Sequence, residues 1–138
     1  MRRRARPTTR REIAALVRAA RAARRRAYAP YSRFPVGAAV LAASGAVVAA
    51  CNVENASYGL SMCAERAAMH RAVAEGYRRL RAVAVAAGQK GAMPCGACRQ
   101  VMAEFGVRDV IVAGPRGEPQ VFRLAELLAR PFSPSDLP

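Results

Sequence analysis

The stretch SMCAERAAMH, residues 61–70, places a cysteine, a glutamate and an arginine within four consecutive positions. The Ala-rich run that follows predicts a helix from about Cys63 to Glu75, which Gly76 ends. A thiol and a carboxylate in the first turn of a helix lie near the positive end of its dipole, which stabilises their charged forms. The stretch therefore predicts one helix of the fold, and the residues at the start of that helix are suited to metal binding or proton transfer.

A second cysteine motif, PCGACRQ at residues 94–100, follows about thirty residues later. Cys95 and Cys98 are three positions apart at a predicted helix start, so their side chains point the same way. Together with Cys63 they offer three thiolates near two positive helix ends. Zinc accepts sulfur ligands in tetrahedral geometry, and three protein ligands leave its fourth position open, as in a catalytic site.

Two other side chains are candidates for a fourth ligand. His70 lies seven residues beyond Cys63, about 10 Å along a helix, which is too far for a shared metal ion. Cys51 ends a predicted strand, where we expect a buried small hydrophobe; the alternative is a closed, structural four-thiolate site. Glu65 favours the open site, because a carboxylate near a ligand can take a proton from a zinc-bound water. Its alternative role is a favourable charge in the first helical turn.

The segments around the two motifs alternate between strands and helices. TRRE, residues 9–12, is a capping-box pattern that predicts a first helix to about Arg26. Two apolar runs flank the turn ASG and predict a hairpin. The periodicity of apolar residues predicts strands at residues 36–42, 47–53, 80–87, 110–113 and 120–123. It predicts further helices at residues 63–75, 95–105 and 124–128. This order indicates one α/β domain, layered α/β/α, with a central mixed sheet of about five strands.

The basic residues are concentrated at the N-terminal end. The chain has 138 residues, a length typical of one domain, and a net charge of +14. Residues 1–33 contain twelve arginines and one acid, Glu12. We interpret residues 1–8 as a disordered basic arm and residues 9–138 as the catalytic domain. A solvated arm and helix face explain the charge; the alternatives are a polyanion-binding arm and an organelle-targeting arm.

The composition also bears on location. No apolar run approaches the roughly 20 residues that span a bilayer, and the start MRRRARPTTRR lacks the apolar stretch of a secretory signal. We therefore expect a soluble, cytoplasmic protein without a membrane partner. In that reducing compartment, cysteines more often serve as ligands, nucleophiles or buried small side chains than as disulfides.

The two cysteine motifs, CAER and PCGACRQ, resemble those of the zinc-dependent cytidine deaminase family. The segments YAPYSRFPVGAAV, CNVENASYG and CRQVMAEF are similar to the small, homotetrameric, nucleoside-acting branch of that family, so the resemblance runs from Tyr28 to Leu137. The Arg-rich arm departs from the pattern. So does LLARPF, where Ala129 stands in place of a proline that relatives often have.

The resemblance implies roles for the metal site. Cys63, Cys95 and Cys98 would hold one Zn²⁺ per chain, and Glu65 would be the catalytic proton shuttle. Arg66 would hydrogen-bond the ligand sulfurs and offset their excess negative charge; the alternative for Arg66 is a surface ion pair.

The resemblance also implies roles in substrate binding. Asn52 and Glu54 would bind a ribose hydroxyl, and Phe34 would pack on the pyrimidine. The backbone of Ala64, with that of Cys95, would recognise the edges of the base. Phe132 would supply another aromatic wall from a neighbouring subunit, as in tetrameric relatives.

The implied activity is the hydrolytic deamination of cytidine and 2′-deoxycytidine to uridine and 2′-deoxyuridine plus ammonia, in pyrimidine salvage. We expect a nucleoside as the small-molecule partner, a homotetramer with shared active sites and no nucleic-acid partner. One alternative is a blasticidin-type or polynucleotide deaminase. Another is a non-catalytic, zinc-stabilised nucleic-acid-binding module, which would leave Glu65 and the NVE segment without a role.

Overall fold

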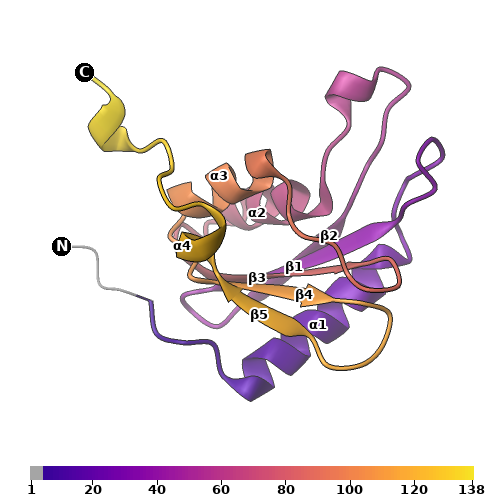
Figure 1. Ribbon diagram of the computed structural model, residues 1–138, viewed down its shortest axis with the longest axis horizontal. Helices are drawn as coiled ribbons and strands as arrows, with labels where there is room; N and C mark the ends of the chain where they lie inside the picture. The colour runs from indigo at the N-terminus through magenta and orange to yellow at the C-terminus, as the bar shows by residue number, and fades with distance from the viewer. Residues whose placement is uncertain (1–4) are drawn as a thin grey trace.

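A five-stranded mixed sheet lies at the centre of the computed structural model, which describes residues 5–138 (Figure 1). The strand order is β2-β1-β3-β4-β5. β1 pairs antiparallel with β2 and β3, β3 and β4 are parallel, and β5 is antiparallel to β4. The strands are β1 (Val36–Ala42), β2 (Val47–Cys51), β3 (Leu80–Ala87), β4 (Asp109–Ala113) and β5 (Gln120–Arg123). The predicted α/β class and the mixed sheet of about five strands are confirmed.

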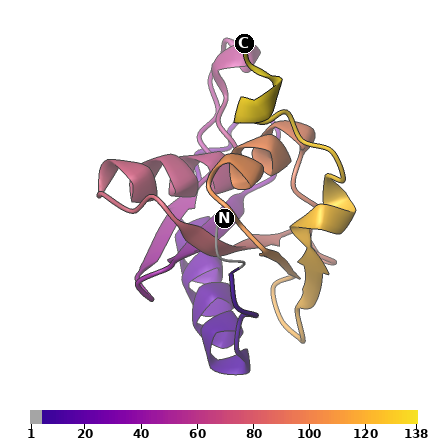
Figure 2. The ribbon, with the colours of Figure 1, turned by 90° about the vertical axis from the view of Figure 1, so that its left-hand side faces the viewer.

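Helices cover both faces of this sheet (Figures 1 and 2). α1 (Arg10–Arg24) lies on one face, and α2 (Ala64–Ala74) and α3 (Gly96–Glu104) lie on the other. Alternate residues of a strand point to opposite faces, and the core accordingly divides in two: Leu41 packs with Leu16 of α1, and Val40 packs with Met69 of α2. The shorter helices are η1 (Tyr58–Leu60), α4 (Leu124–Leu127) and η2 (Pro134–Asp136). Across residues 5–138, no helix combines the length and apolar character needed to cross a membrane.

Glycine at position 37 allows α1 to cross close over β1. A Cβ atom built on Gly37 would lie 1.9 Å from the carbonyl oxygen of Ala20 and 2.5 Å from the backbone nitrogen of Arg24. Both contacts are with helix backbone, which cannot move aside as a flexible side chain can. The helix therefore packs against the strand at a distance that only glycine permits.

The start of α1 is joined to the sheet by polar contacts. Thr9 and Glu12 form the predicted capping box, and Glu12 also makes an ion pair of 3.1 Å with the buried Arg81 of β3. Just before the helix, Thr8 donates hydrogen bonds from its backbone nitrogen and its hydroxyl to Asp109 of β4. The predicted arm is thus bound to the domain at Thr8. Residues 1–4 of the arm lie outside the described residues.

A second set of contacts brings the loop after β2 to the start of α2. Val53 and Met62 exchange backbone hydrogen bonds of 3.0 and 2.8 Å, and Tyr28 pairs with Val53 from the other side. Residues 54–61 between them project from the body as a loop that carries η1 (Figure 1). This arrangement places Glu54 and Cys63 at the same end of the sheet.

Candidate active site

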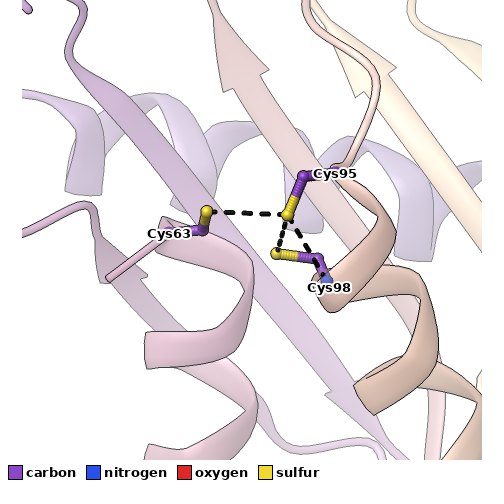
Figure 3. A group of neighbouring side chains, drawn as sticks. All are labelled: Cys63, Cys95 and Cys98. Carbon is purple, nitrogen blue, oxygen red and sulfur yellow. Dashed lines mark hydrogen bonds between the residues drawn. The ribbon is translucent and has the colours of Figure 1, made fainter. Parts of the chain in front are cut away.

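Three cysteine side chains converge where α2 and α3 begin (Figure 3). Cys63 occupies the N-cap position of α2, Cys95 occupies that of α3, and Cys98 lies in the first turn of α3. The Sγ atom of Cys95 lies 3.8 Å from that of Cys63 and 3.4 Å from that of Cys98, and all three Sγ atoms fall within 4.8 Å of one another. The two motifs, separated in sequence, thus form one cluster, as predicted from their positions at helix starts.

The spacing of the cluster suits a single zinc ion. Tetrahedral bonds of about 2.3 Å from zinc to sulfur place the sulfurs about 3.8 Å apart, close to the distances found here. The two helix N-termini add partial positive charge, which favours thiolates over thiols. Cys98 is buried and Cys95 is exposed, so the cluster is closed on the core side and open toward solvent. Cys51 is not a member of this group, and His70 lies on the exposed surface of α2.

Arg66, in the first turn of α2, lies beside the cluster. Its Nη2 donates a hydrogen bond of 3.6 Å to the Sγ atom of Cys63, and its buried Nε has no hydrogen-bond partner among residues 5–138. Hydrogen bonding from Cys98, and secondarily from Arg66, lowers the pKa of Cys63 to about 5. The Cys63 thiolate in turn raises the pKa of Arg66. A positive group at this point offsets part of the negative charge that three thiolates bring to a dication.

Glu65 is buried, with 5 % of its surface exposed, and lines the same cavity as Cys63. Burial raises the pKa of its carboxyl group, and the negative charge of the Cys63 thiolate acts in the same direction. A carboxyl group whose pKa lies nearer to neutrality can both accept and return a proton. The arrangement is thus a proton-transfer group beside a cluster suited to a metal.

The cavity next to the cluster has a volume of about 280 Å³. It collects residues from five separate parts of the chain, and most of the predicted site residues are among them. The lining consists of Ser32, Phe34, Val36, Asn52, Glu54, Ser61, Met62, Cys63, Ala64, Glu65, Val85, Ala92, Met93 and Cys95. A cavity of about this size, with apolar walls and a few polar groups among them, is typical of small-ligand sites.

Asn52 and Glu54 are held by the segment that precedes β1. The Oδ1 atom of Asn52 accepts a hydrogen bond of 2.8 Å from the backbone of Val36, and its Nδ2 donates one of 3.0 Å to the carbonyl of Phe34. The carboxylate of Glu54 accepts from the backbone nitrogens of Tyr31 and Ser32 at 2.9 and 3.1 Å, and from the Ser32 hydroxyl. These donors lower the pKa of Glu54, so the group presents a fixed negative charge at the mouth of the cavity.

Ser32 and Met93 are cavity residues that the sequence reasoning did not single out. Ser32 lies inside YAPYSRFPV, and its role in holding Glu54 depends on a contact across 22 residues of sequence. Met93 comes from the loop before Cys95, next to the PCGACRQ motif. In both cases the only signal available was proximity to a motif.

Phe132 lies apart from the cavity, with 60 % of its surface exposed. Its backbone is fixed to α3, because its nitrogen donates to Gln100 at 3.2 Å and its carbonyl oxygen accepts from Gln100 at 2.8 Å. The backbone of the tail is thus ordered while the aromatic ring remains uncovered within the single chain.

Fold and site together define a layered α/β protein with a cluster of three cysteines suited to a metal ion and a buried glutamate beside it. The family model described as the cytidine and deoxycytidylate deaminase zinc-binding region matches residues 10–114. The chain belongs to this family, and by its donor set and family it is a zinc protein with one zinc site per chain.

Individual relatives are similar over nearly the whole chain. A cytidine deaminase of Sporosarcina psychrophila is 44 % identical over 129 residues, which cover 91 % of this chain and 95 % of the relative. One from Halalkalibacterium halodurans is 48 % identical over 125 residues, covering 88 % and 95 %. The crystal structure of cytidine deaminase from Burkholderia pseudomallei superposes with a TM-score of 0.81 at 48 % identity, covering 86 % of this chain and 98 % of that one.

Proposed function

We propose that this protein is a cytidine deaminase that hydrolyses cytidine and 2′-deoxycytidine to uridine and 2′-deoxyuridine and releases ammonia. The observation that carries the proposal is the buried Glu65 carboxyl in a cavity of about 280 Å³ that also exposes two of the three clustered thiols, Cys63 and Cys95. Family membership and relatives at 44 and 48 % identity support the same activity. We assign it to pyrimidine salvage in the cytoplasm.

Cys63, Cys95 and Cys98 are the proposed ligands of the zinc ion. When bound, zinc would lower the pKa of a water molecule toward neutrality and so make it a nucleophile at physiological pH. Arg66 moderates the negative charge of the thiolates, which would otherwise weaken the zinc as an acid. Its hydrogen bond to Cys63 supports this role.

Glu65 moves protons between the water and the substrate. Its carboxylate accepts a proton as the water oxygen forms a bond to C4 of the pyrimidine, and it delivers this proton to ring nitrogen N3. The remaining water proton then passes through Glu65 to the amino group, the bond between C4 and the exocyclic nitrogen breaks, and ammonia leaves. Each positioned proton transfer of this kind typically contributes about 10²- to 10⁴-fold to a rate.

The cavity walls supply the proposed recognition of the nucleoside. Phe34 packs against the pyrimidine ring, and the backbone of Ala64 and Cys95 contacts the base edges. Glu54 accepts a hydrogen bond from a ribose hydroxyl, with Asn52 beside it. The geometry supports Glu54 for this task, because its carboxylate lies at the mouth of the cavity and is already oriented by Ser32. Asn52 also orders the backbone that carries Phe34.

The proposed assembly is a homotetramer in which neighbouring subunits complete one another's active sites. Phe132 is the residue we expect to reach the cavity of a neighbour. Large apolar side chains left uncovered in the single chain support an assembly: Tyr58 is 73 % exposed and Leu60 is 70 % exposed, and both belong to η1 in the projecting loop.

Incubation of the purified protein with cytidine, with formation of uridine and ammonia as the readout, tests the proposed function. Blasticidin S and a single-stranded oligonucleotide that contains cytosine serve as comparison substrates under the same conditions. We expect turnover of cytidine and 2′-deoxycytidine only. Deamination of either comparison substrate without turnover of cytidine would contradict the proposal, and so would a zinc-loaded protein that deaminates none of them.

A further inference from the structure

An open groove of about 820 Å³ runs along the outer side of α1, between this helix and the loop that connects β4 to β5. α1 covers the face of the sheet opposite to α2 and α3 (Figures 1 and 2). The groove and the cysteine cluster therefore lie on opposite sides of the sheet. The lining consists of Arg10, Ile13, Ala14, Val17, Arg18, Arg21, Ala22, Arg25, Gly117, Glu118 and Pro119. The active site uses none of these residues.

The groove is strongly basic. Four of its lining residues are arginines and one, Glu118, is acidic. The side chains of Arg10, Arg18 and Arg25 are exposed and make no hydrogen bond or ion pair with the rest of residues 5–138. Guanidinium groups that lack an internal partner are free to bind an external anion.

Arg21 has a different role from the other three. Its Nε donates a hydrogen bond of 3.0 Å to the carbonyl of Gly114, and its Nη2 donates one of 3.1 Å to that of Gly117. These bonds fix the β4–β5 loop to α1. The groove is therefore a formed feature of the fold, with one wall attached to the other by Arg21.

The length of the basic row favours an extended ligand. Arg10 and Arg25 are fifteen residues apart, which corresponds to about 22 Å along a helix at 1.5 Å per residue, and Arg18 lies between them. A compact anion such as a free phosphate would contact one arginine at a time. A chain of regularly spaced phosphates can contact all three at once.

The chemistry of the walls distinguishes among extended anions. Stable insertion into a lipid interface needs large apolar side chains such as Trp, Phe and Leu, whereas the apolar side chains of this groove are two Ala, one Ile, one Pro and the buried Val17. No aromatic residue lines the groove, so bases would have no surface to stack on. The walls fit a nucleic-acid backbone that is contacted through phosphates alone, without reading of sequence.

We propose that this groove docks a strand of nucleic acid through its phosphate groups, on the side of the molecule opposite the active site. The inference is independent of the proposed deaminase activity and assigns no reaction to the bound strand. It assigns a binding role to three of the arginines that are concentrated near the N-terminus, namely Arg10, Arg18 and Arg25. The prediction of no nucleic-acid partner interpreted the arginines as a solvated arm and helix face, with a polyanion-binding arm as an alternative. The present proposal differs from that prediction for the groove along this helix.

Fluorescence anisotropy of the full chain with a labelled 20-nucleotide single-stranded RNA of mixed sequence tests the proposal. With three phosphates contacted, the logarithm of the binding constant should fall with the logarithm of salt concentration with a slope of about −2, the value expected for single strands. The triple variant Arg10→Gln, Arg18→Gln, Arg25→Gln should bind at least about tenfold more weakly at 50 mM salt and reduce this slope.

A second triple variant, Arg78→Gln, Arg79→Gln, Arg130→Gln, removes the same charge from exposed positions outside the groove and is the matched control. It should bind RNA within about twofold of the original chain. The single change Arg18→Gln, in the middle of the row, should weaken binding by a few-fold. This variant tests the groove even if the triple variant does not fold. Cytidine turnover should be the same in all variants and at saturating RNA.

Several results would overturn the proposal. Equal losses in the two triple variants would mean that net charge, and not the groove, binds the RNA. Absence of RNA binding by the original chain at 50 mM salt would remove the docking site altogether. Competition by phosphatidylglycerol vesicles at lower phosphate concentration than unlabelled RNA would assign the groove to a membrane surface. Competitive inhibition of cytidine turnover by the RNA would place the binding at the active site.

Discussion

The Sγ atoms of Cys63 and Cys95 lie 3.8 Å apart, although 32 residues separate them in the sequence. Each cysteine occupies the N-cap position of its helix, and the two helices pack side by side on one face of the sheet. The sheet therefore brings together two helix N-termini whose partial charges both favour thiolate. Cys98, in the first turn of α3, completes a group of three donors.

Replacing any one of Cys63, Cys95 and Cys98 by alanine should abolish stoichiometric zinc binding, because two thiolates hold zinc far less tightly than three. Elemental analysis of protein purified without chelators measures this, and the original chain should carry about one zinc per chain. Cys51→Ala is the control and should retain the metal, since Cys51 lies outside the group. Loss of zinc from the Cys51 variant would contradict the open three-ligand site.

Gly37→Ala should destabilise the fold by about 3 kcal/mol, because the added methyl group would overlap the backbone of α1. Urea denaturation followed by circular dichroism gives the change in the free energy of unfolding. Gly59→Ala is the matched control: nothing lies within 4 Å of the position that its Cβ would occupy, and its stability should be nearly unchanged. A Gly37 variant as stable as the control would show that α1 does not pack on β1 at this distance.

Glu12→Gln should lower stability at pH 7 by about 1 to 2 kcal/mol, and the difference should shrink in acid. Hydrogen bonds from Arg81 hold the pKa of Glu12 in the folded protein at about 2, below its ordinary value of 4.5. The stabilising contribution of the carboxylate is thus present above about pH 4.5 and is lost as the pH falls toward 2. Urea denaturation of both proteins at pH 7 and pH 3 measures this; a difference independent of pH would refute the ion pair as its cause.

Ser32→Ala should raise the KM for cytidine by about three- to tenfold and affect kcat less, because Ser32 orients Glu54 and touches no reacting atom. Steady-state kinetics with cytidine separates the two parameters. Ser44→Ala, in the exposed turn between β1 and β2, is the control and should leave both unchanged. An unchanged KM in the Ser32 variant would show that the orientation of Glu54 by Ser32 does not contribute to substrate binding.

Local patterns in the sequence were sufficient to predict most elements of the fold. The predicted capping box of Thr9 and Glu12 is present, and the predicted strands 80–87 and 120–123 have the observed bounds. The predicted elements differ from the structure at their ends: α1 ends at Arg24 instead of about Arg26, and β2 ends at Cys51 instead of Val53. The short helices η1 and η2 were not predicted. Val53 leaves the strand because its backbone pairs with Met62 and Tyr28, and such a long-range pairing has no local signature.

The metal cluster could be predicted because its donors have a marked spacing and lie at helix starts. The supporting contacts could not be predicted in the same way. The hydroxyl of Ser32 binds Glu54, and the amide of Asn52 binds the backbone around Phe34, through distances that only the folded chain creates. The groove along α1 could not be predicted for a similar reason. The sequence shows the arginines, but it does not show that Arg21 binds the β4–β5 loop beside them.

The central claim is that Glu65 moves the protons of a zinc-dependent deamination, and Glu65→Gln tests it most directly. Glutamine keeps the shape of the side chain but cannot accept and return a proton. The measurement is the rate of uridine formation from cytidine by the original chain and the variant, both shown by elemental analysis to contain zinc. We predict a fall of at least about 10³-fold in the variant, because more than one proton transfer depends on the same carboxyl group. A variant that holds zinc and deaminates cytidine at nearly the original rate would contradict the account.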